Sequence, residues 1–332
     1  MMQPTQREQQ RIHGGPDAFG AARFDFSTNS NACGPCPPAL AVIQQADATR
    51  YPDASYTALR ARLAAFHEVD VQRVVLAASA SEFIFRITAM VAGRGGRSAG
   101  LPPHSYGDYA HAASVHGLKV ADAGVADLCW ACEPSSPLGQ VHGNFFSASS
   151  TVQVLDRAYE PLRLKGTFAH AGDLHKLWQL YSPNKALGLT GVRAAYAIAP
   201  VDAAADVETM NQLCPSWPIG AHGVAMLEAW TQPETQVWLA GSLATLQLWK
   251  TQQIALCESM GWTVLPSMAN FFVCSIGDGL RIESAMTQLR QHGIKLRDCA
   301  SFGLSGHVRI SVQPPAAQVA LHNAWLQIQG KT

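Results

Sequence analysis

Short apolar runs alternate with helical patterns through the first two thirds of the chain. The runs predict buried strands at residues 73–78, 99–103, 128–132, 151–155 and 192–199. Apolar residues recur at helical spacing over residues 81–91, and residues 109–116 predict a second helix. Strands that alternate with helices in this way favour a mostly parallel sheet with helices on both faces. We therefore expect an α/β fold.

The pattern changes after residue 220. Residues 236–260 predict one long helix and residues 282–291 a shorter one, with strand-like runs at 262–265, 271–275 and 307–312. This mixture predicts a separate small α+β domain. The expected organisation is an N-terminal arm and part of the small domain in residues 1–40, the large domain in 41–225 and the rest of the small domain in 226–332.

Composition narrows the class of protein. Hydrophobic residues make up 48% of the 332 residues and charged residues 14%, which suits packed globular domains. The 24 basic and 24 acidic residues balance without a basic block, so neither nucleic acid nor a membrane surface is an expected partner. The N-terminus lacks the apolar core of a secretory signal. We expect a cytoplasmic protein whose partners are a small molecule and a second copy of the chain.

Two CxxC pairs occur, Cys33 with Cys36 and Cys129 with Cys132. A redox site of the thioredoxin type needs a strand before the first cysteine and a helix that opens at it. Polar residues precede Cys33 and two prolines follow Cys36, so the context does not fit. A zinc site would have to join two distant pairs without supporting histidines. We expect a turn, a buried strand end and no metal site.

The stretch SPNKALGLTGVR, residues 182–193, contains the most informative chemistry. A lysine in a cation-rich pocket can lose its proton and bond to an aldehyde, which is the role open to Lys185. Hydroxyl and guanidinium groups such as Ser182 and Arg193 bind a dianionic phosphate. Together these groups meet the needs of pyridoxal-5'-phosphate (PLP). The alternative is a surface lysine in a loop beside a structural arginine.

Two further segments add to this pattern. Asp156 ends a predicted strand, with Tyr159 three residues later, and a buried carboxylate there could keep the pyridine nitrogen of PLP protonated. Small residues at Ser79, Ala80 and Ser81 open a predicted helix, where backbone N–H groups can approach an anion. The alternatives are a strand-ending Asp that caps the next segment and an ordinary helix start.

These segments resemble those of the PLP-dependent class I/II aminotransferases of fold type I, in the same order from His13 to Val312. The spacing of Ser182, Lys185 and Arg193 and the Asp156–Tyr159 pair carry the resemblance. It implies an aspartate aminotransferase-like large domain in which Lys185 holds PLP as a Schiff base. Asp156 and Tyr159 would be catalytic, and Tyr159 would donate to the phenolate oxygen of the cofactor.

Other roles also follow from the resemblance. Tyr106 would stack on the pyridine ring, and Tyr51 would reach the phosphate of the neighbouring subunit in a homodimer. Arg309 would hold the α-carboxylate of the substrate. Arg297, His13 and Asn31 would contact its distal end. Plain packing and surface ion pairs are the alternatives for these tyrosines and arginines.

One segment departs from the family pattern. Residues 133–139, EPSSPLG, stand where the family has an Asn that bonds the cofactor's phenolate oxygen, and Ser136 replaces that Asn. Ser136 could act through a water, or Tyr159 could act alone. The HGG at residues 13–15 and the segment DFSTNSN at 25–31 resemble threonine-phosphate decarboxylases of cobalamin synthesis. Histidinol-phosphate aminotransferases are similar too.

Three functions stay open from the sequence. The first is decarboxylation of an O-phosphorylated amino acid, with L-threonine O-3-phosphate in cobalamin biosynthesis as the leading substrate. The second is transamination of a phosphorylated or other amino acid. The third is PLP binding without catalysis, which the serines at positions 79 and 136 suggest.

Overall fold

The computed structural model describes residues 13–142, 152–168, 171–276 and 282–330. A seven-stranded sheet forms its larger part, in the order β2-β8-β7-β6-β5-β3-β4. Its strands are β2 Val74–Ala77, β3 Ser98–Gly100, β4 Lys119–Ala121, β5 Leu128–Cys132, β6 Val152–Asp156, β7 Trp178–Tyr181 and β8 Ala195–Ile198. Only β8 runs against its neighbours. The mostly parallel α/β sheet expected from the sequence is confirmed.

Side chains alternate between two apolar layers on the faces of this sheet. Val74 and Leu76 of β2 join one core, whereas Val75 and Ala77 join the other, because successive strand side chains point to opposite faces. The helices divide accordingly. The first core packs α1 Pro37–Gln44, α2 Thr57–His67 and α6 Ala221–Trp230, and the second packs α3 Ala80–Gly93, α4 Gly107–Val115 and α5 Ala204–Gln212.

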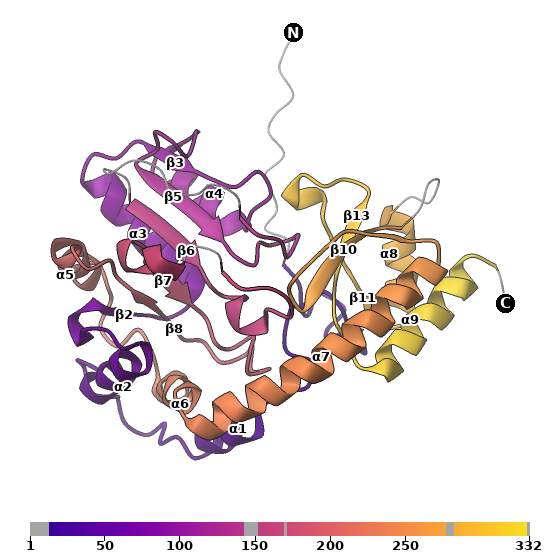
Figure 1. Ribbon diagram of the computed structural model, residues 1–332, viewed down its shortest axis with the longest axis horizontal. Coiled ribbons are helices and arrows are strands. Elements are labelled where there is room, and N and C mark those ends of the chain that lie inside the picture. Colours follow the sequence, from indigo (N-terminus) through magenta and orange to yellow (C-terminus); the bar gives the residue numbers. More distant parts are fainter. Residues whose placement is uncertain (1–12, 143–151, 169–170, 277–281, 331–332) are drawn as a thin grey trace, which may run out of the picture.

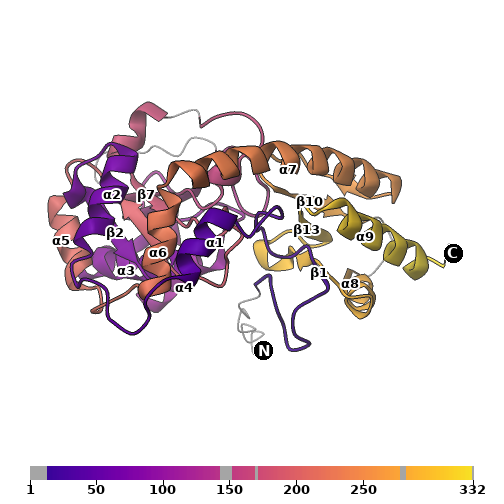
Figure 2. The ribbon, with the colours of Figure 1, turned by 90° about the horizontal axis from the view of Figure 1, so that it is seen from below.

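The smaller part is built on an antiparallel sheet in the order β12-β13-β10-β9. Its strands are β9 Thr263–Val264, β10 Phe271–Ser275, β12 Arg297–Asp298 and β13 His307–Ser311, with α8 Ile282–Gln291 and α9 Pro315–Ile328 beside them (Figure 1). The long helix α7 Pro233–Ser259 runs from the large part to the small one (Figure 2). No helix in the described ranges is both long and apolar enough to cross a bilayer.

The N-terminal segment contributes to the small part. Strand β1 Phe24–Asp25 pairs in parallel with β11 Ile294–Lys295, and the backbone N–H of Ser311 donates to the carbonyl of Phe26 at 2.8 Å. This pairing supports a small domain made from both chain ends. The boundary expected between residues 225 and 226 would cut α6, which is a continuous helix, so we propose to place it after Trp230.

The two CxxC pairs lie in different settings. Cys33 is in a turn, and α1 begins at Pro37, after Cys36 rather than at Cys33. Cys129 and Cys132 belong to β5. All eight cysteines are free thiols. The arm at residues 1–12 lies outside the described residues.

Candidate active site

Most of the predicted cofactor-binding residues lie beyond one edge of the large sheet. Parallel strands end at the same edge, which is where open α/β sheets bind ligands. Each of these strand ends is followed by candidate residues. They are Ser79 and Ser81 after β2, Tyr106 after β3, Ser136 after β5, Asp156 and Tyr159 at the end of β6, and Ser182 and Lys185 after β7. Arg193 comes just before β8, whose reversed direction brings its start to the same edge.

Asp156 has the environment expected for a carboxylate that faces a cation. Its side chain is 5% exposed and accepts hydrogen bonds from the hydroxyl of Tyr109 at 2.6 Å and the backbone N–H of Ala158 at 2.9 Å. Burial raises the pKa of Asp156 above the usual carboxyl range, and the two hydrogen bonds and the charge of Lys185 oppose this. Within the described residues Asp156 forms no salt bridge. A protonated pyridine nitrogen would supply the missing cation.

Lys185 and Tyr159 lie near each other. The Lys185 Nζ is 5.5 Å from the centroid of the Tyr159 ring. The loop that carries Lys185 is held from the N-terminal segment, because the backbone N–H of Asn31 donates to the Lys185 carbonyl at 2.9 Å. The Asn31 amide donates to the Ala186 carbonyl at 3.0 Å and to Ser242 Oγ at 2.8 Å. Asn31 therefore supports the lysine loop, and its predicted contact with the substrate stays a prediction.

The start of α3 and the loop after β3 meet at the same place. Ser81 Oγ and the Tyr106 hydroxyl are 3.2 Å apart, and the His13 ring lies 5.9 Å from the Tyr106 ring between centroids. Ser79 caps α3, since its Oγ accepts from the backbone N–H of Glu82 at 3.1 Å. Ala80 is the first residue of the helix. The free backbone N–H groups at this helix start suit an anion.

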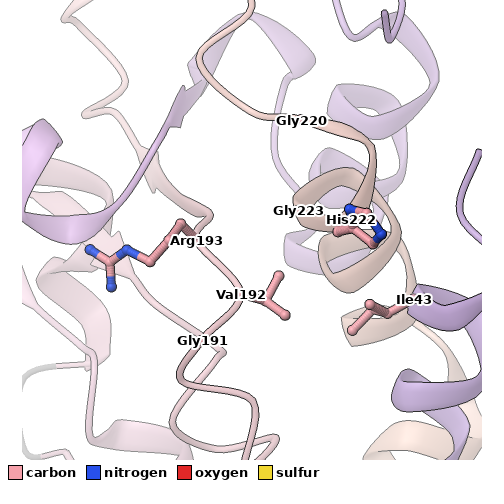
Figure 3. Close-up of a pocket in the computed structure, with 7 residues that line it drawn as sticks. All are labelled: Ile43, Gly191, Val192, Arg193, Gly220, His222 and Gly223. Carbon is pink, nitrogen blue, oxygen red and sulfur yellow. The ribbon is translucent and has the colours of Figure 1, made fainter. Parts of the chain in front are cut away.

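Arg193 and Ser182 lie on the two sides of the Gly-rich turn. Ser182 is buried and donates to Asn184 Oδ1 at 2.9 Å. Arg193 is exposed and lines a hollow of about 330 Å³ together with Ile43, Gly191, Val192, Gly220, His222 and Gly223. In Figure 3 its side chain extends away from Ile43 and His222. Since neither Lys185 nor Asp156 lines this hollow, it is not the candidate active site.

Two buried arginines approach the site from the small sheet. Arg309 donates to Ser136 Oγ at 3.2 Å and to the Ser27 carbonyl at 3.0 Å, while its Nε has no hydrogen-bond partner in the described structure. Arg297 donates to Ser301 Oγ at 2.8 Å. Both guanidinium groups lie over the Phe302 ring, at 4.8 Å for Arg297 and 5.8 Å for Arg309. Burial, with the neighbouring Arg309 charge, lowers the pKa of Arg297 to about 10.

Two residues of this region were not singled out from the sequence. Tyr109 donates to Asp156, stacks on Trp130 with ring centroids 4.4 Å apart and is completely buried. Asn29 is 2% exposed, and both polar atoms of its amide have no partner in the described structure. It stands in the chain between Ser27, which binds Arg309, and Asn31, which binds the lysine loop. The DFSTNSN segment was the available signal for Asn29.

Within the part of the chain that the structure describes, Tyr51 forms no hydrogen bond or ring contact with these site residues. Its side chain is 78% exposed and stacks on Trp217, with the ring centroids 4.6 Å apart. Trp217 is exposed too, and its indole N–H donates to the Pro52 carbonyl at 3.1 Å. In one subunit Tyr51 is thus a surface residue. No group of three or more potential metal ligands occurs among the described residues.

The residues present fit PLP. One edge of a mostly parallel sheet carries a buried carboxylate that has no salt bridge to any described residue, a lysine beside a tyrosine, and a capped helix start. Fold and site together define a PLP-dependent enzyme that acts on an amino acid as a transaminase or decarboxylase. The family model for aminotransferase class I and II matches residues 141–321, more than half of the chain. The chain belongs to this family.

Individual proteins agree with this assignment. A histidinol-phosphate aminotransferase 1 of Thiobacillus denitrificans is 28% identical over 327 residues, covering 89% of this chain and 83% of the relative. A putative histidinol-phosphate aminotransferase structure from Erwinia carotovora atroseptica has a TM-score of 0.81 at 19% identity, covering 96% of this chain and 99% of that one.

Two further structures have the same fold. The histidinol-phosphate aminotransferase of Sinorhizobium meliloti in complex with pyridoxal-5'-phosphate has a TM-score of 0.75 at 19% identity, covering 90% of this chain and 89% of that one. The L-threonine-O-3-phosphate decarboxylase of Porphyromonas gingivalis has a TM-score of 0.70 at 20% identity, covering 92% and 97%.

Proposed function

We propose that this PLP-dependent enzyme decarboxylates an O-phosphorylated amino acid, with L-threonine O-3-phosphate as the leading substrate. The observation that carries the proposal is the approach of two buried arginines, Arg297 and Arg309, to one Phe302 ring. Burying two like charges close together costs desolvation and repulsion free energy, and an anionic ligand that contacts both guanidinium groups would offset part of that cost. A substrate with both a carboxylate and a phosphate supplies two anions. The product, an amino alcohol phosphate, would serve cobalamin biosynthesis.

The site residues divide the work as follows. Lys185 binds the cofactor covalently, and Asp156, oriented by Tyr109 and Ala158, holds the proton on the pyridine nitrogen. Arg309 binds the α-carboxylate. PLP would supply an electron sink at the α-carbon for the loss of the carboxylate as CO2. Lys185, once the substrate amine had displaced it from the cofactor, could return a proton to the α-carbon through Nζ.

The cofactor is held from several strands in this proposal. Tyr106 stacks on its ring. Ser79, Ala80, Ser81, Ser182 and Arg193 surround its phosphate, and Tyr51 of a second subunit completes the phosphate site in a homodimer. The residues that face the distal end of the substrate are His13, Arg297, Asn31 and Asn29, whose amide has no hydrogen-bond partner among the described residues.

Ser136 has a different role from the Asn that it replaces. Its hydroxyl accepts a hydrogen bond from Arg309. This contact supports a role in orienting the carboxylate-binding arginine, which leaves Tyr159 as the donor to the phenolate oxygen of the cofactor.

Transamination is the second candidate, because the similar proteins named above are mostly histidinol-phosphate aminotransferases. The test uses PLP-loaded protein with O-phospho-L-threonine in one reaction and with histidinol phosphate plus 2-oxoglutarate in another. We expect CO2 from the first and no glutamate from the second. Glutamate without CO2 would establish the transaminase instead. A cofactor absorbance band that neither substrate changes would support a PLP-binding protein without catalysis.

A further inference from the structure

A hydrogen bond joins the loop after β3, which carries Tyr106, to the turn that contacts Arg297 and Arg309. The Nδ1 atom of His104, in the loop after β3, lies 2.7 Å from the carbonyl oxygen of Phe302. Phe302 ends the short helical turn η4, Ala300–Phe302, in the small part of the chain. A carbonyl oxygen only accepts, so Nδ1 must carry the proton in this contact.

The turn reached by His104 holds the two arginines. Ser301 accepts a hydrogen bond from Arg297 at 2.8 Å, and the Phe302 ring covers the guanidinium groups of Arg297 and Arg309. Backbone bonds from Phe302 N–H and Leu304 N–H to the Cys299 carbonyl, at 2.9 and 3.1 Å, keep the turn closed. A shift of the turn would therefore move Ser301 and Phe302 together.

His104 itself lies in the loop that carries Tyr106, the residue predicted to stack on the cofactor ring. His104 lies two residues before Tyr106, whose hydroxyl is 3.2 Å from Ser81 at the start of α3. His104 is half-buried, and in the described structure it forms no hydrogen bond or ring contact with Lys185 or Asp156. It is thus positioned to fix the distance between the Tyr106 loop and the arginine turn.

We propose that His104 is a positioning residue that latches the Ala300–Phe302 turn against the large sheet and so aligns Arg297 and Arg309 for an anionic substrate. The substrate part of this inference rests on the proposed function. Loss of the latch loosens the arginines but leaves Lys185 and Asp156 unchanged. The Michaelis constant should then rise about 3- to 10-fold, the effect of one lost hydrogen bond, with little change in kcat.

Three variants separate the hydrogen bond from other effects. His104→Phe keeps an aromatic ring but removes the donor. His104→Asn keeps an N–H group near the position of Nδ1. His322→Ala, on α9 at the far side of the small sheet, is the matched control.

The first measurement is amide hydrogen exchange in PLP-loaded protein over residues 299–304, where the Phe302 and Leu304 amides are hydrogen-bonded. Exchange should accelerate in His104→Phe and stay near the unaltered rate in His104→Asn and His322→Ala. Unchanged exchange in His104→Phe would overturn the latch, whatever the substrate is. Since exchange does not depend on turnover, this result is separate from the test of the proposed function.

The second measurement is steady-state kinetics with O-phospho-L-threonine. We expect a raised Michaelis constant in His104→Phe and recovery in His104→Asn. A Phe variant with lower kcat at an unchanged Michaelis constant would contradict the positioning role. If His104→Phe does not fold, Ser301→Ala decides the question, because it must raise the Michaelis constant in the same way, and a normal value would reject the proposal.

Discussion

Asp156 must satisfy two opposing requirements. Burial in the free protein penalises its charge and raises its pKa, while the proposed chemistry needs that charge beside a protonated pyridine nitrogen. The hydrogen bonds from Tyr109 and Ala158 reduce the cost without removing it. The ionised Asp156 therefore lowers the free energy of unfolding of the cofactor-free protein, and a protonated pyridine nitrogen beside it would remove this cost.

The first prediction concerns Asp156→Asn in the cofactor-free protein. The folded carboxyl group holds its proton more tightly than the unfolded one, so its contribution to stability falls as pH rises from the ordinary value of about 3.9 through the raised pKa. At pH 7 the variant should be more stable than the unaltered protein, and the two should converge near about pH 3.5. Urea unfolding at both pH values measures this, with exposed Asp202→Asn as control. Lower stability of the variant at pH 7 would contradict the argument.

The same variant should lose turnover when PLP is bound. Breaking a buried charge pair costs about 3–5 kcal/mol, which corresponds to a fall in kcat of about 100-fold or more. Cofactor absorbance should persist because Lys185 is intact. Near-normal kcat would remove Asp156 from the proposed mechanism.

A second residue prediction concerns Arg309→Lys. Lysine keeps the charge but loses the planar fork that contacts a carboxylate with two bonds. Each charge-assisted bond is worth about 1.5–3 kcal/mol, so the Michaelis constant should rise about 10- to 100-fold. Arg94→Lys, in the ion pair with Asp206 at the surface, serves as control. An unaltered Michaelis constant would show that Arg309 does not bind the substrate.

At the scale of elements, Ser79 has a structural role at the start of α3, as a helix cap, that can be measured apart from its proposed role in phosphate binding. Ser79→Ala removes the hydroxyl that caps the Glu82 N–H and should lower the free energy of unfolding by about 1 kcal/mol, whereas Ser79→Gly should cost only a few tenths. Urea denaturation of the cofactor-free protein measures both. Equal losses in the two variants would rule out capping as the source of the effect.

Strands that are buried on both faces were predicted well, because their sequences are uninterrupted runs of apolar residues. Residues 128–132 and 271–275 match β5 and β10 fully. Strand β7, Trp178–Tyr181, was missed because buried Gln179 interrupts its apolar run. Helix α9 was missed because it follows Pro314 directly and mixes polar with apolar residues.

The sequence could indicate which candidate residues follow strand ends, although their roles stay predictions, and it could not indicate which of them form hydrogen bonds within the protein. The pattern brought Lys185, Asp156 and Tyr159 to one edge. It could not tell that the Asn31 amide is hydrogen-bonded within the protein while the Asn29 amide has no partner among the described residues, since both belong to one polar segment.

At the scale of the whole molecule, the exposed stack of Tyr51 and Trp217 supports a second subunit. We predict a homodimer in which Tyr51 completes the partner's phosphate site. Inactive Lys185→Ala mixed with Tyr51→Phe should regain part of the activity, because one of the two sites in a heterodimer is then intact. Sedimentation gives the oligomeric state, and a monomer at working concentration would exclude the shared site.

The central claim is that Lys185 holds the cofactor at the carboxyl edge of the large sheet. Borohydride reduction of the PLP-loaded protein, followed by peptide mapping, tests it most directly. The account predicts that the cofactor is fixed to one peptide, the one that contains Lys185, and that Lys185→Ala yields no labelled peptide. Labelling at Lys165, Lys176 or Lys250 in its place would contradict the account.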